Sequence, residues 1–174
     1  RVGPQDDADL YWALRGGGGN FGVVTSFLFR LHEMQRDVVT GYFAYPMDQV
    51  KQVMSFYAEH SMNMPDEMSM GAGIGNRPGK EPSLGIYFVW SGDAAEAEKH
   101  IAPLRKAGTV VSENVRTMDY VAVQRSGDID DTRAFTGQMK SGFLNEVSDE
   151  LVDKIVALSR KVPFGDPLDP RTQV

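Results

Sequence analysis

The stretch LRGGGGNFGVV, residues Leu14–Val24, contains five glycines within the seven positions 16–22. Glycine costs about 1 kcal/mol per position relative to alanine in regular structure, so this run predicts a loop. Glycine, and to a lesser degree Asn20, also tolerates positive φ, which lets the backbone lie flat against a bulky partner. A flexible hinge is the alternative, but the alternating apolar segment that follows favours a loop that contacts a ligand.

The segments on either side of the glycines decide which known motif this loop can be. Residues 9–15 predict a short helix with Asp9 as its N-cap, and the alternation over residues 23–31 predicts a half-buried strand. Gly17-x-Gly19-x-x-Gly22 matches the dinucleotide fingerprint, yet that motif needs a strand before it and a helix after it. The order here is reversed, so we reject the fingerprint. Neither His-Arg-Asp nor Asp-Phe-Gly occurs in the chain, which also excludes a protein kinase loop.

A resemblance accounts for the loop better than either motif. Residues 9–25, DLYWALRGGGGNFGVVT, resemble the end of the FAD-binding domain in berberine-bridge-enzyme-like flavoprotein oxidases, which have the vanillyl-alcohol-oxidase or PCMH-type fold. Residues 118–124 and 140–144 are more weakly similar to substrate-domain stretches of bacterial members. The resemblance implies FAD as the cofactor. It also implies that the flavin would lie along Gly19, Asn20, Phe21, Gly22 and Val24.

The same resemblance divides the chain into three parts. Residues 1–31, with the glycine loop and the strand, would be the tail of an FAD-binding domain. Residues 32–162 would form an α+β substrate domain, and residues 163–174 a polar tail. The chain would then be a fragment of a longer protein whose N-terminal FAD-binding region is missing.

Hydrophobic periodicity independently predicts the architecture of the second part. Apolar residues alternate in strand-like segments and recur at helical spacing between them, in the order strand, helix, strand, strand, helix, strand. This split βαβ order predicts a ferredoxin-like antiparallel sheet with helices on one face. The expected elements are residues 38–45, 47–62, 68–75, 84–90, 93–108 and 109–116, followed by one helical turn at 120–125, a strand at 134–144 and a final helix capped by Ser148.

Composition limits the classes of function. The chain of 174 residues has 18 basic and 24 acidic residues, for a net charge of −6, which argues against nucleic acid and anionic membranes as partners. It contains no cysteine, which excludes disulfides, thiolate metal sites and the cysteine-linked flavin of some family members. No apolar run approaches the ~20 residues that span a bilayer. We expect a cytoplasmic protein that acts on a small molecule, and a homo-oligomer is compatible with the sequence.

Candidate catalytic residues are few. The three histidines stand singly, without metal-ligand spacing, so we expect no metal site. Lys140 lies in the expected strand 134–144, where period two puts it on one face with Gln138 and Gly142 and puts Met139 and Phe143 on the opposite, core face. In the family this sheet roofs the substrate cavity. Lys140 could orient a substrate oxygen or, with a lowered pKa, assist its deprotonation; a solvated edge lysine is the alternative. Tyr120 and Gln124 could similarly line the cavity or simply pack.

The sequence therefore predicts a fragment of an FAD-linked oxidoreductase. Such an enzyme transfers a hydride from an alcohol, sugar or amine carbon to flavin, and oxygen is the expected acceptor. The family's covalent flavin histidine, pyrophosphate loop and C-terminal tyrosine motif have no counterpart here, so we expect the chain alone to be inactive and to hold little FAD. A non-catalytic ferredoxin-like binding or assembly module, with the glycines as a hinge, is the alternative.

Overall fold

The computed structural model describes residues 1–75, 81–128 and 141–159. The chain divides into two compact units, Arg1–Glu33 and Met34–Val174.

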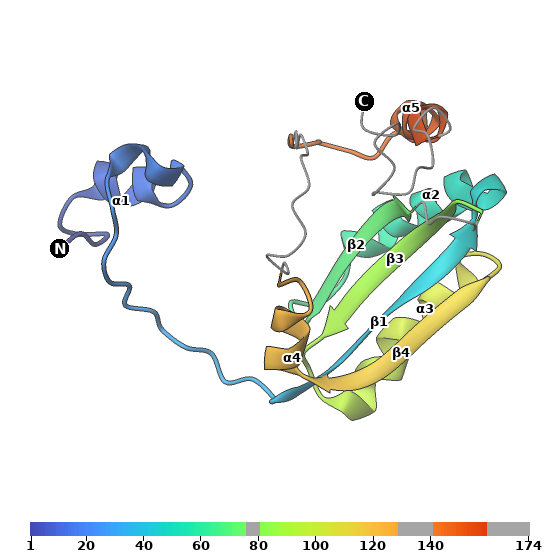
Figure 1. Ribbon diagram of the computed structural model, residues 1–174, viewed down its shortest axis with the longest axis horizontal. Coiled ribbons are helices and arrows are strands. Elements are labelled where there is room, and N and C mark those ends of the chain that lie inside the picture. The colour runs from blue at the N-terminus through green and yellow to red at the C-terminus, as the bar shows by residue number, and fades with distance from the viewer. Residues whose placement is uncertain (76–80, 129–140, 160–174) are drawn as a thin grey trace, which may run out of the picture. The chain divides into compact units, whose positions relative to one another are not determined.

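The second unit is built on a four-stranded sheet in the order β2-β3-β1-β4, in which every neighbouring pair is antiparallel (Figure 1). Its strands are β1 (Asp37–Pro46), β2 (Met68–Gly75), β3 (Ser83–Trp90) and β4 (Ser112–Asp119). This is the ferredoxin-like order that the split βαβ pattern predicts, and it confirms the expected fold class. β4 starts three residues later than the periodicity indicated, at Ser112 instead of Thr109.

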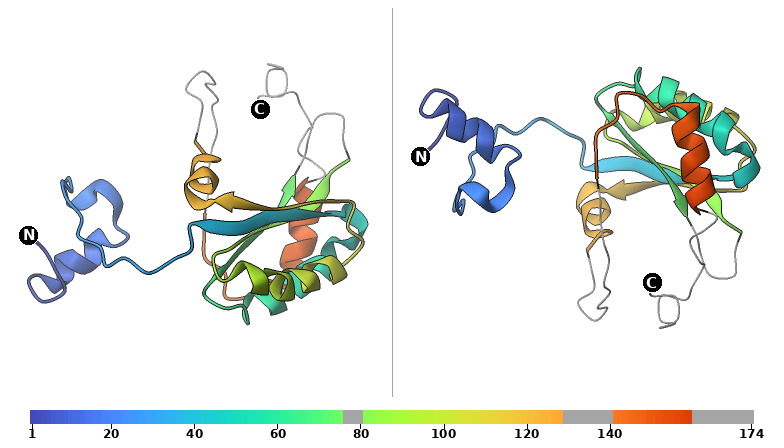
Figure 2. Two further views of the ribbon diagram at one scale, coloured as in Figure 1. Left: turned by 90° about the horizontal axis from the view of Figure 1, so that it is seen from below. Right: turned by 90° about the horizontal axis from the view of Figure 1, so that it is seen from above.

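Three helices cover one face of this sheet. The 3-10 turn η2 (Met47–Gln49) leads into α2 (Val50–Ser61), and η3 (Ala94–Glu96) leads into α3 (Ala97–Lys106). Figure 2 shows α2, α3 and α5 (Asp149–Ser159) on one side of the sheet and the short helix α4 (Tyr120–Arg125) on the other. No helix in the described residues is long and apolar enough to cross a membrane.

The hydrophobic core lies between the sheet and these three helices. Four alternate residues of β3 point into this core, as the strand periodicity predicted, and all of them are buried: Leu84, Ile86, Phe88 and Trp90. They meet apolar side chains from β1, α2 and α3, because both the sheet and the helices must remove one apolar surface from water. The buried residues include Phe43, Tyr45, Val50, Val53, Leu84, Ile86, Phe88, Trp90, Ile101 and Leu104.

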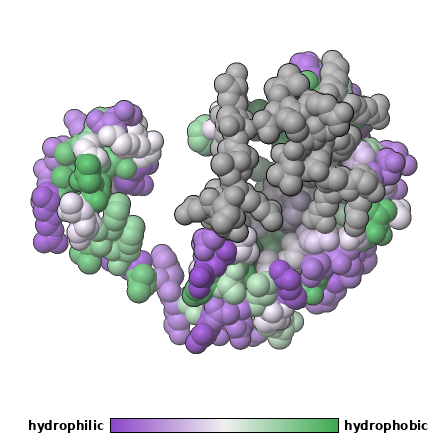
Figure 3. All heavy atoms as spheres, viewed as in Figure 1, coloured by the Kyte–Doolittle hydropathy of each residue, from purple (hydrophilic) through white to green (hydrophobic). Residues whose placement is uncertain are grey.

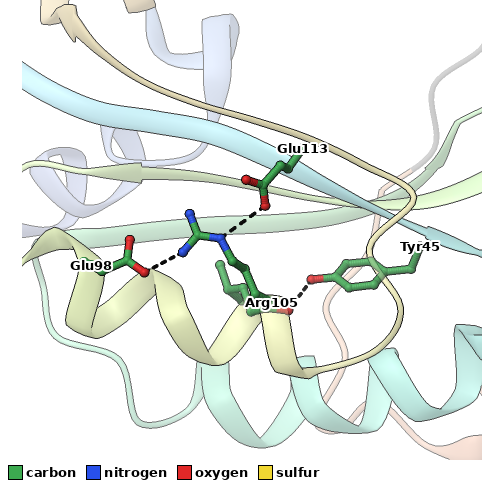
Figure 4. A network of polar contacts seen from close by, with 5 residues as sticks. Tyr45, Glu98, Arg105 and Glu113 are labelled. Carbon is green, nitrogen blue, oxygen red and sulfur yellow. Dashed lines mark hydrogen bonds and ion pairs between the residues drawn. The ribbon is translucent and has the colours of Figure 1, made fainter.

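Polar contacts fix α3 against the sheet. The Tyr45 hydroxyl donates to the Leu104 carbonyl at 2.6 Å, and burial raises the pKa of this phenol to about 12. The Arg105 guanidinium lies between Glu98 and Glu113, with its Nε 3.1 Å from the Glu113 Oε2 (Figure 4). Arg105 thus ties α3 to β4, and its guanidinium also lies 5.4 Å from the centroid of the Phe43 ring.

Caps set the beginnings of two of these helices. The Asp93 Oδ1 accepts a hydrogen bond from the Ala95 backbone N–H at 2.9 Å, and the Ser148 Oγ accepts one from Leu151 at 3.3 Å. Both residues cap the helices that the sequence assigned to them. The helix after Asp93 contains Pro103 and ends at Lys106, with Ala107 as its C-cap.

The first unit differs from the expectation in two places. α1 (Ala8–Leu14) is capped by Asp7, not Asp9, because the Asp7 carboxylate reaches the Leu10 N–H at 3.0 Å. Residues 23–31 form no strand, and Val23, Phe29 and Leu31 are 92%, 72% and 88% exposed. A strand exists only through hydrogen bonds to a neighbour, and no described strand pairs with this segment. Figure 3 shows apolar residues at the surface of this unit.

Gly41 is a position in the central strand where only glycine fits. A Cβ there would collide with the Asn114 carbonyl of β4, so Gly41→Ala must push β1 and β4 apart. We expect Gly41→Ala to lower the free energy of unfolding by about 1–3 kcal/mol in urea titration. The control is Gly71→Ala, where an added Cβ meets nothing within 4 Å. Equal stability of the two variants would show that β4 can move away from β1 with no loss of free energy of unfolding.

Candidate functional site

The face of the sheet turned away from α2, α3 and α5 is the main candidate for a binding surface; we call it the open face. Strand alternation and the pairing register assign its residues. They are Val38, Thr40, Tyr42 and Ala44 of β1; Ser69, Gly71, Gly73 and Gly75 of β2; Ser83, Gly85, Tyr87 and Val89 of β3; and Ser112, Asn114, Arg116 and Met118 of β4.

Two tyrosines at the centre of the open face form an aromatic surface. Tyr42 and Tyr87 are direct cross-strand partners, and their ring centroids lie 6.2 Å apart. The Tyr42 hydroxyl lies 3.4 Å from the Ser112 Oγ on the neighbouring strand. Tyr87 is 49% exposed, and its ring lies over Gly85, where an added Cβ would come within 3.1 Å of it. Rings and hydroxyls together suit a ligand that has both an apolar face and polar substituents.

Beside the tyrosines, β2 leaves room for such a ligand. Gly71, Gly73 and Gly75 present no side chain on the open face, and an added Cβ at any of them would meet no atom of the described residues within 4 Å. A molecule can therefore approach the backbone of β2 while it contacts Tyr87, the cross-strand partner of Gly71.

Helix α4 closes one end of the open face. It contacts β1 and β4, and Val38 at that end of β1 is buried (Figure 2). The Asp119 Oδ1 caps α4 by accepting from the N–H groups of Val121 and Ala122. Its Oδ2 accepts from the Arg36 Nε at 2.6 Å, and this hydrogen bond holds the pKa of the Asp119 carboxyl below its ordinary value. Asp119 therefore fixes both the helix and the start of β1.

The glycine loop of the first unit has the backbone geometry that its composition predicted. Gly18 and Gly22 have φ of 63° and 125°, and η1 (Gly18–Phe21) lies between Gly17 and Gly22. The Asn20 amide donates to the Gly17 carbonyl at 2.8 Å, which holds the turn. An added Cβ at Gly18, Gly19 or Gly22 would meet nothing within 4 Å, so another molecule can reach the backbone here.

The residues of this loop fit a flat ring system. Phe21 and Val24 are 50% and 43% exposed, so apolar side chains stand beside open backbone. Open backbone next to apolar atoms suits the edge and face of an aromatic ring such as flavin. That Gly19, Asn20, Phe21, Gly22 and Val24 contact the flavin stays a prediction.

The other residues predicted for the site are Lys140, Tyr120 and Gln124. Lys140 lies outside the described residues. Residues 141–144 form no strand, and Phe143, which the alternation placed in the core, is fully exposed; the expected strand is wrong for this part. No described strand pairs with residues 141–144. Tyr120 is half-buried in α4 and Gln124 is exposed.

Two other features do not form a site. Within the described ranges no group of three or more histidine, cysteine or acidic side chains could hold a metal ion. His60 and His100 stack on Phe56 and Trp90, respectively, which is packing. An apolar recess lies between α2, β2, β3 and α5, but apolar side chains form most of its lining, so it offers a substrate few polar groups.

Comparison with known proteins gives the family. No family model matches the chain. It is 29% identical over 126 residues to an FAD-linked oxidoreductase of Dictyostelium discoideum, covering 71% of this chain and 26% of that protein. It is 27% identical to the (R)-6-hydroxynicotine oxidase of Paenarthrobacter nicotinovorans, covering 79% and 29%. It is 30% identical to the FAD-linked oxidoreductase aurO of Gibberella zeae, covering 72% and 25%.

A solved structure agrees. The xylooligosaccharide oxidase of Myceliophthora thermophila C1, in complex with xylobiose, superposes with a TM-score of 0.58 and 27% sequence identity, covering 76% of this chain and 29% of that one. The chain is similar to FAD-linked oxidoreductases over about three quarters of its length. Its resemblance to the berberine-bridge-enzyme-like oxidases is thereby confirmed, and FAD is the cofactor of its family. The chain spans about a quarter of the length of the curated FAD-linked oxidoreductases it matches.

Sequence reasoning missed the open-face tyrosines. The alternation of residues 38–45 and 84–90 was used only to predict which side chains face the core, and not which side chains share the opposite face. The same alternation places Tyr42 and Tyr87 on the opposite face, and the split βαβ order makes their strands neighbours. The signal was present in the combination of period and strand order.

The ion pair of Asp119 predicts how the stability of the fold changes at acidic pH. Its folded pKa is depressed, so its ion pair stabilises the fold above the ordinary carboxyl pKa of 3.8 and loses that effect as the pH falls through the lower folded value. Asn still caps a helix, so Asp119→Asn removes mainly the charge. We expect a lower urea midpoint than the parent at neutral pH and a difference that shrinks below about pH 3.

The control for this experiment is Asp128→Asn, which removes the carboxylate 3.7 Å from Arg125 in an exposed ion pair. It should change the urea midpoint little at either pH, because exposed pairs contribute little. A pH-independent effect of Asp119→Asn would show that Asp119 acts only as a cap.

Proposed function

We propose that this chain is part of an FAD-linked oxidoreductase that transfers a hydride from an alcohol, sugar or amine carbon to flavin, with oxygen as the acceptor. The observation that carries the proposal is the superposition on a xylooligosaccharide oxidase over 76% of the chain at 27% identity. In this reaction a substrate C–H bond breaks as a hydride leaves, and the attached hydroxyl or amine loses a proton. FAD, when bound, supplies the hydride acceptor, and oxygen takes the electrons in turn.

The glycine loop is proposed to contribute flavin contacts. Gly19, Asn20, Phe21, Gly22 and Val24 would lie along the ring system, supported by the open backbone at Gly19 and Gly22 and by the exposed Phe21 ring. Because the chain spans only 25–29% of its relatives, other flavin contacts would come from the remainder of the protein. We therefore propose that the chain alone holds little FAD and is inactive.

The open face is proposed to bind the substrate. The Tyr42 and Tyr87 rings would pack against the apolar face of a substrate ring, while their hydroxyls, with Ser112 and Asn114, would hydrogen-bond to its substituents. Positioning of this kind holds the reacting carbon in a defined orientation, which is a large part of what a protein adds to flavin chemistry. Lys140 remains our proposed group for orienting or deprotonating the substrate oxygen.

The first test concerns the loop in the complete, FAD-containing protein. Gly22 has φ of 125°, a conformation that costs a side chain about 1–3 kcal/mol, so Gly22→Ala should distort the loop. We expect a lower flavin-to-protein absorbance ratio after purification. Gly16→Ala is the matched control, since its Cβ meets nothing within 4 Å and its φ is not positive. Equal flavin content in both variants would show that the glycines form only a hinge.

The second test concerns the open face. Gly71→Leu would place a side chain in the space beside Tyr87; its Cβ meets no atom of the described residues within 4 Å, so we expect the fold to keep its melting temperature. Anaerobic reduction of the flavin by substrate should slow at least about tenfold, a loss of about 1.4 kcal/mol. The control is Thr117→Leu, at an exposed position on the other face of β4. Unchanged reduction in Gly71→Leu would show that the open face does not bind the substrate, whereas no reduction in the parent protein would favour the alternative, a non-catalytic binding module.

A further inference from the structure

The open face carries a single charge. Among its residues in the four strands, all of which the structure describes, Arg116 of β4 is the one charged side chain. The others are glycine, alanine, serine, threonine, asparagine, tyrosine, valine and methionine. A cation is notable here because the whole chain has a net charge of −6.

Arg116 makes no hydrogen bond or ion pair with the described part of the chain, whereas Arg36, Arg105 and Arg125 each have an acidic partner there. Asp119, three residues along the strand, is occupied: its two oxygens accept from Arg36 and from the first N–H groups of α4. The guanidinium therefore keeps its donors available on the surface of the sheet.

The pairing register places Arg116 next to the aromatic surface. Tyr87, Tyr42 and Asn114 form one row across β3, β1 and β4. Arg116 is paired with Thr40 in the adjacent row, so it is the diagonal neighbour of Tyr42. Diagonal pairs of this kind lie about 7–8 Å apart, within reach of a long side chain. A ring lying on the tyrosines would bring a substituent directed towards α4 within reach of this guanidinium.

We infer that the substrate is a ring compound bearing a carboxylate, with the ring on Tyr42 and Tyr87 and the carboxylate on Arg116. This inference rests on the proposed function, since it names the substrate class of the same face. A planar guanidinium matches a carboxylate with two parallel hydrogen bonds. The Asn114 amide, two residues away on the same face, is a further neutral donor.

The charge count favours a carboxylate over a phosphate. A phosphate monoester carries close to two negative charges and three acceptor oxygens, and proteins bind it with several cations or a helix N-terminus. The open face offers one guanidinium, which balances one carboxylate. The tyrosine rings are inclined at 45° to each other, so a substrate ring would stack on one of them and meet the edge of the other. Beside Tyr87, an added Cβ at Gly71 meets no atom of the described residues within 4 Å, which leaves room for such a ring.

The test uses the complete protein with FAD bound and two matched pairs of probes. Glucuronate is compared with glucose, and benzoate with benzamide, so that ring shape stays constant while the charge changes. Calorimetry measures the dissociation constant of each probe. We expect the carboxylate of at least one pair to bind at least about tenfold more tightly than its neutral partner, equivalent to about 1.4 kcal/mol. Higher salt should reduce this preference.

The variant Arg116→Gln should abolish the preference and leave binding of the neutral probe unchanged. Arg116→Lys should restore only part of it, because an ammonium cannot form the two parallel hydrogen bonds. The matched control is Lys106→Gln in α3, which removes an exposed positive charge from the opposite side of the sheet and should change nothing. Arg116 is exposed, so melting temperatures should be equal.

Two results would overturn the inference: equal binding of charged and neutral probes by the parent, or a preference that survives in Arg116→Gln. An equal loss in Lys106→Gln would also overturn it, since the effect would then be general electrostatics. Flavin reduction is read separately. If no ring alcohol or amine reduces the flavin, the proposed function fails, while an Arg116-dependent preference would still show a carboxylate site. If neutral sugars reduce the flavin and Arg116→Gln changes nothing, only the inference fails.

Discussion

The central position of β1 is the constraint on which the second unit depends. It pairs along most of its length with β3 on one side and β4 on the other, so a displacement of β1 would break both ladders. The approach to β4 is so close that Gly41 has no room for a side chain. Phe43 and Tyr45 of the same strand are fully buried under α3, where the Tyr45 hydroxyl bonds to Leu104. Sheet pairing and core packing therefore meet in one strand.

Burial on one side of the sheet is what leaves the other side for function. A sheet of this kind needs only one apolar face in contact with helices to be stable. The opposite face is then free to carry tyrosines, a hydroxyl, an amide and a guanidinium at fixed spacings set by the strand register. Rigid strands position such groups more accurately than loops do. The similarity to FAD-linked oxidoreductases gives this face its proposed role as a substrate surface.

The predictions from sequence succeeded where a residue's neighbours along the chain decide its conformation. The alternation of Leu84, Ile86, Phe88 and Trp90, the caps at Asp93 and Ser148, and the strand order of the sheet all follow from local patterns. The failures share one cause. Residues 23–31 alternate like a strand, but strand formation requires a hydrogen-bonding neighbour that the described residues do not provide. The expected core position of Phe143 failed in the same way.

The sequence by itself determined the resemblance to FAD-linked oxidoreductases, the α+β class and the apolar side of each strand, because motif and period are properties of consecutive residues. It also predicted that the glycine run tolerates positive φ, and the structure shows which positions adopt it, Gly18 and Gly22. Only the tertiary structure decided that Tyr42 lies opposite Tyr87 and that Arg116 lies diagonally beside them without an acidic partner in the described chain. These residues are up to 74 positions apart, and strand register, which depends on the packing of the whole core, brings them onto one face.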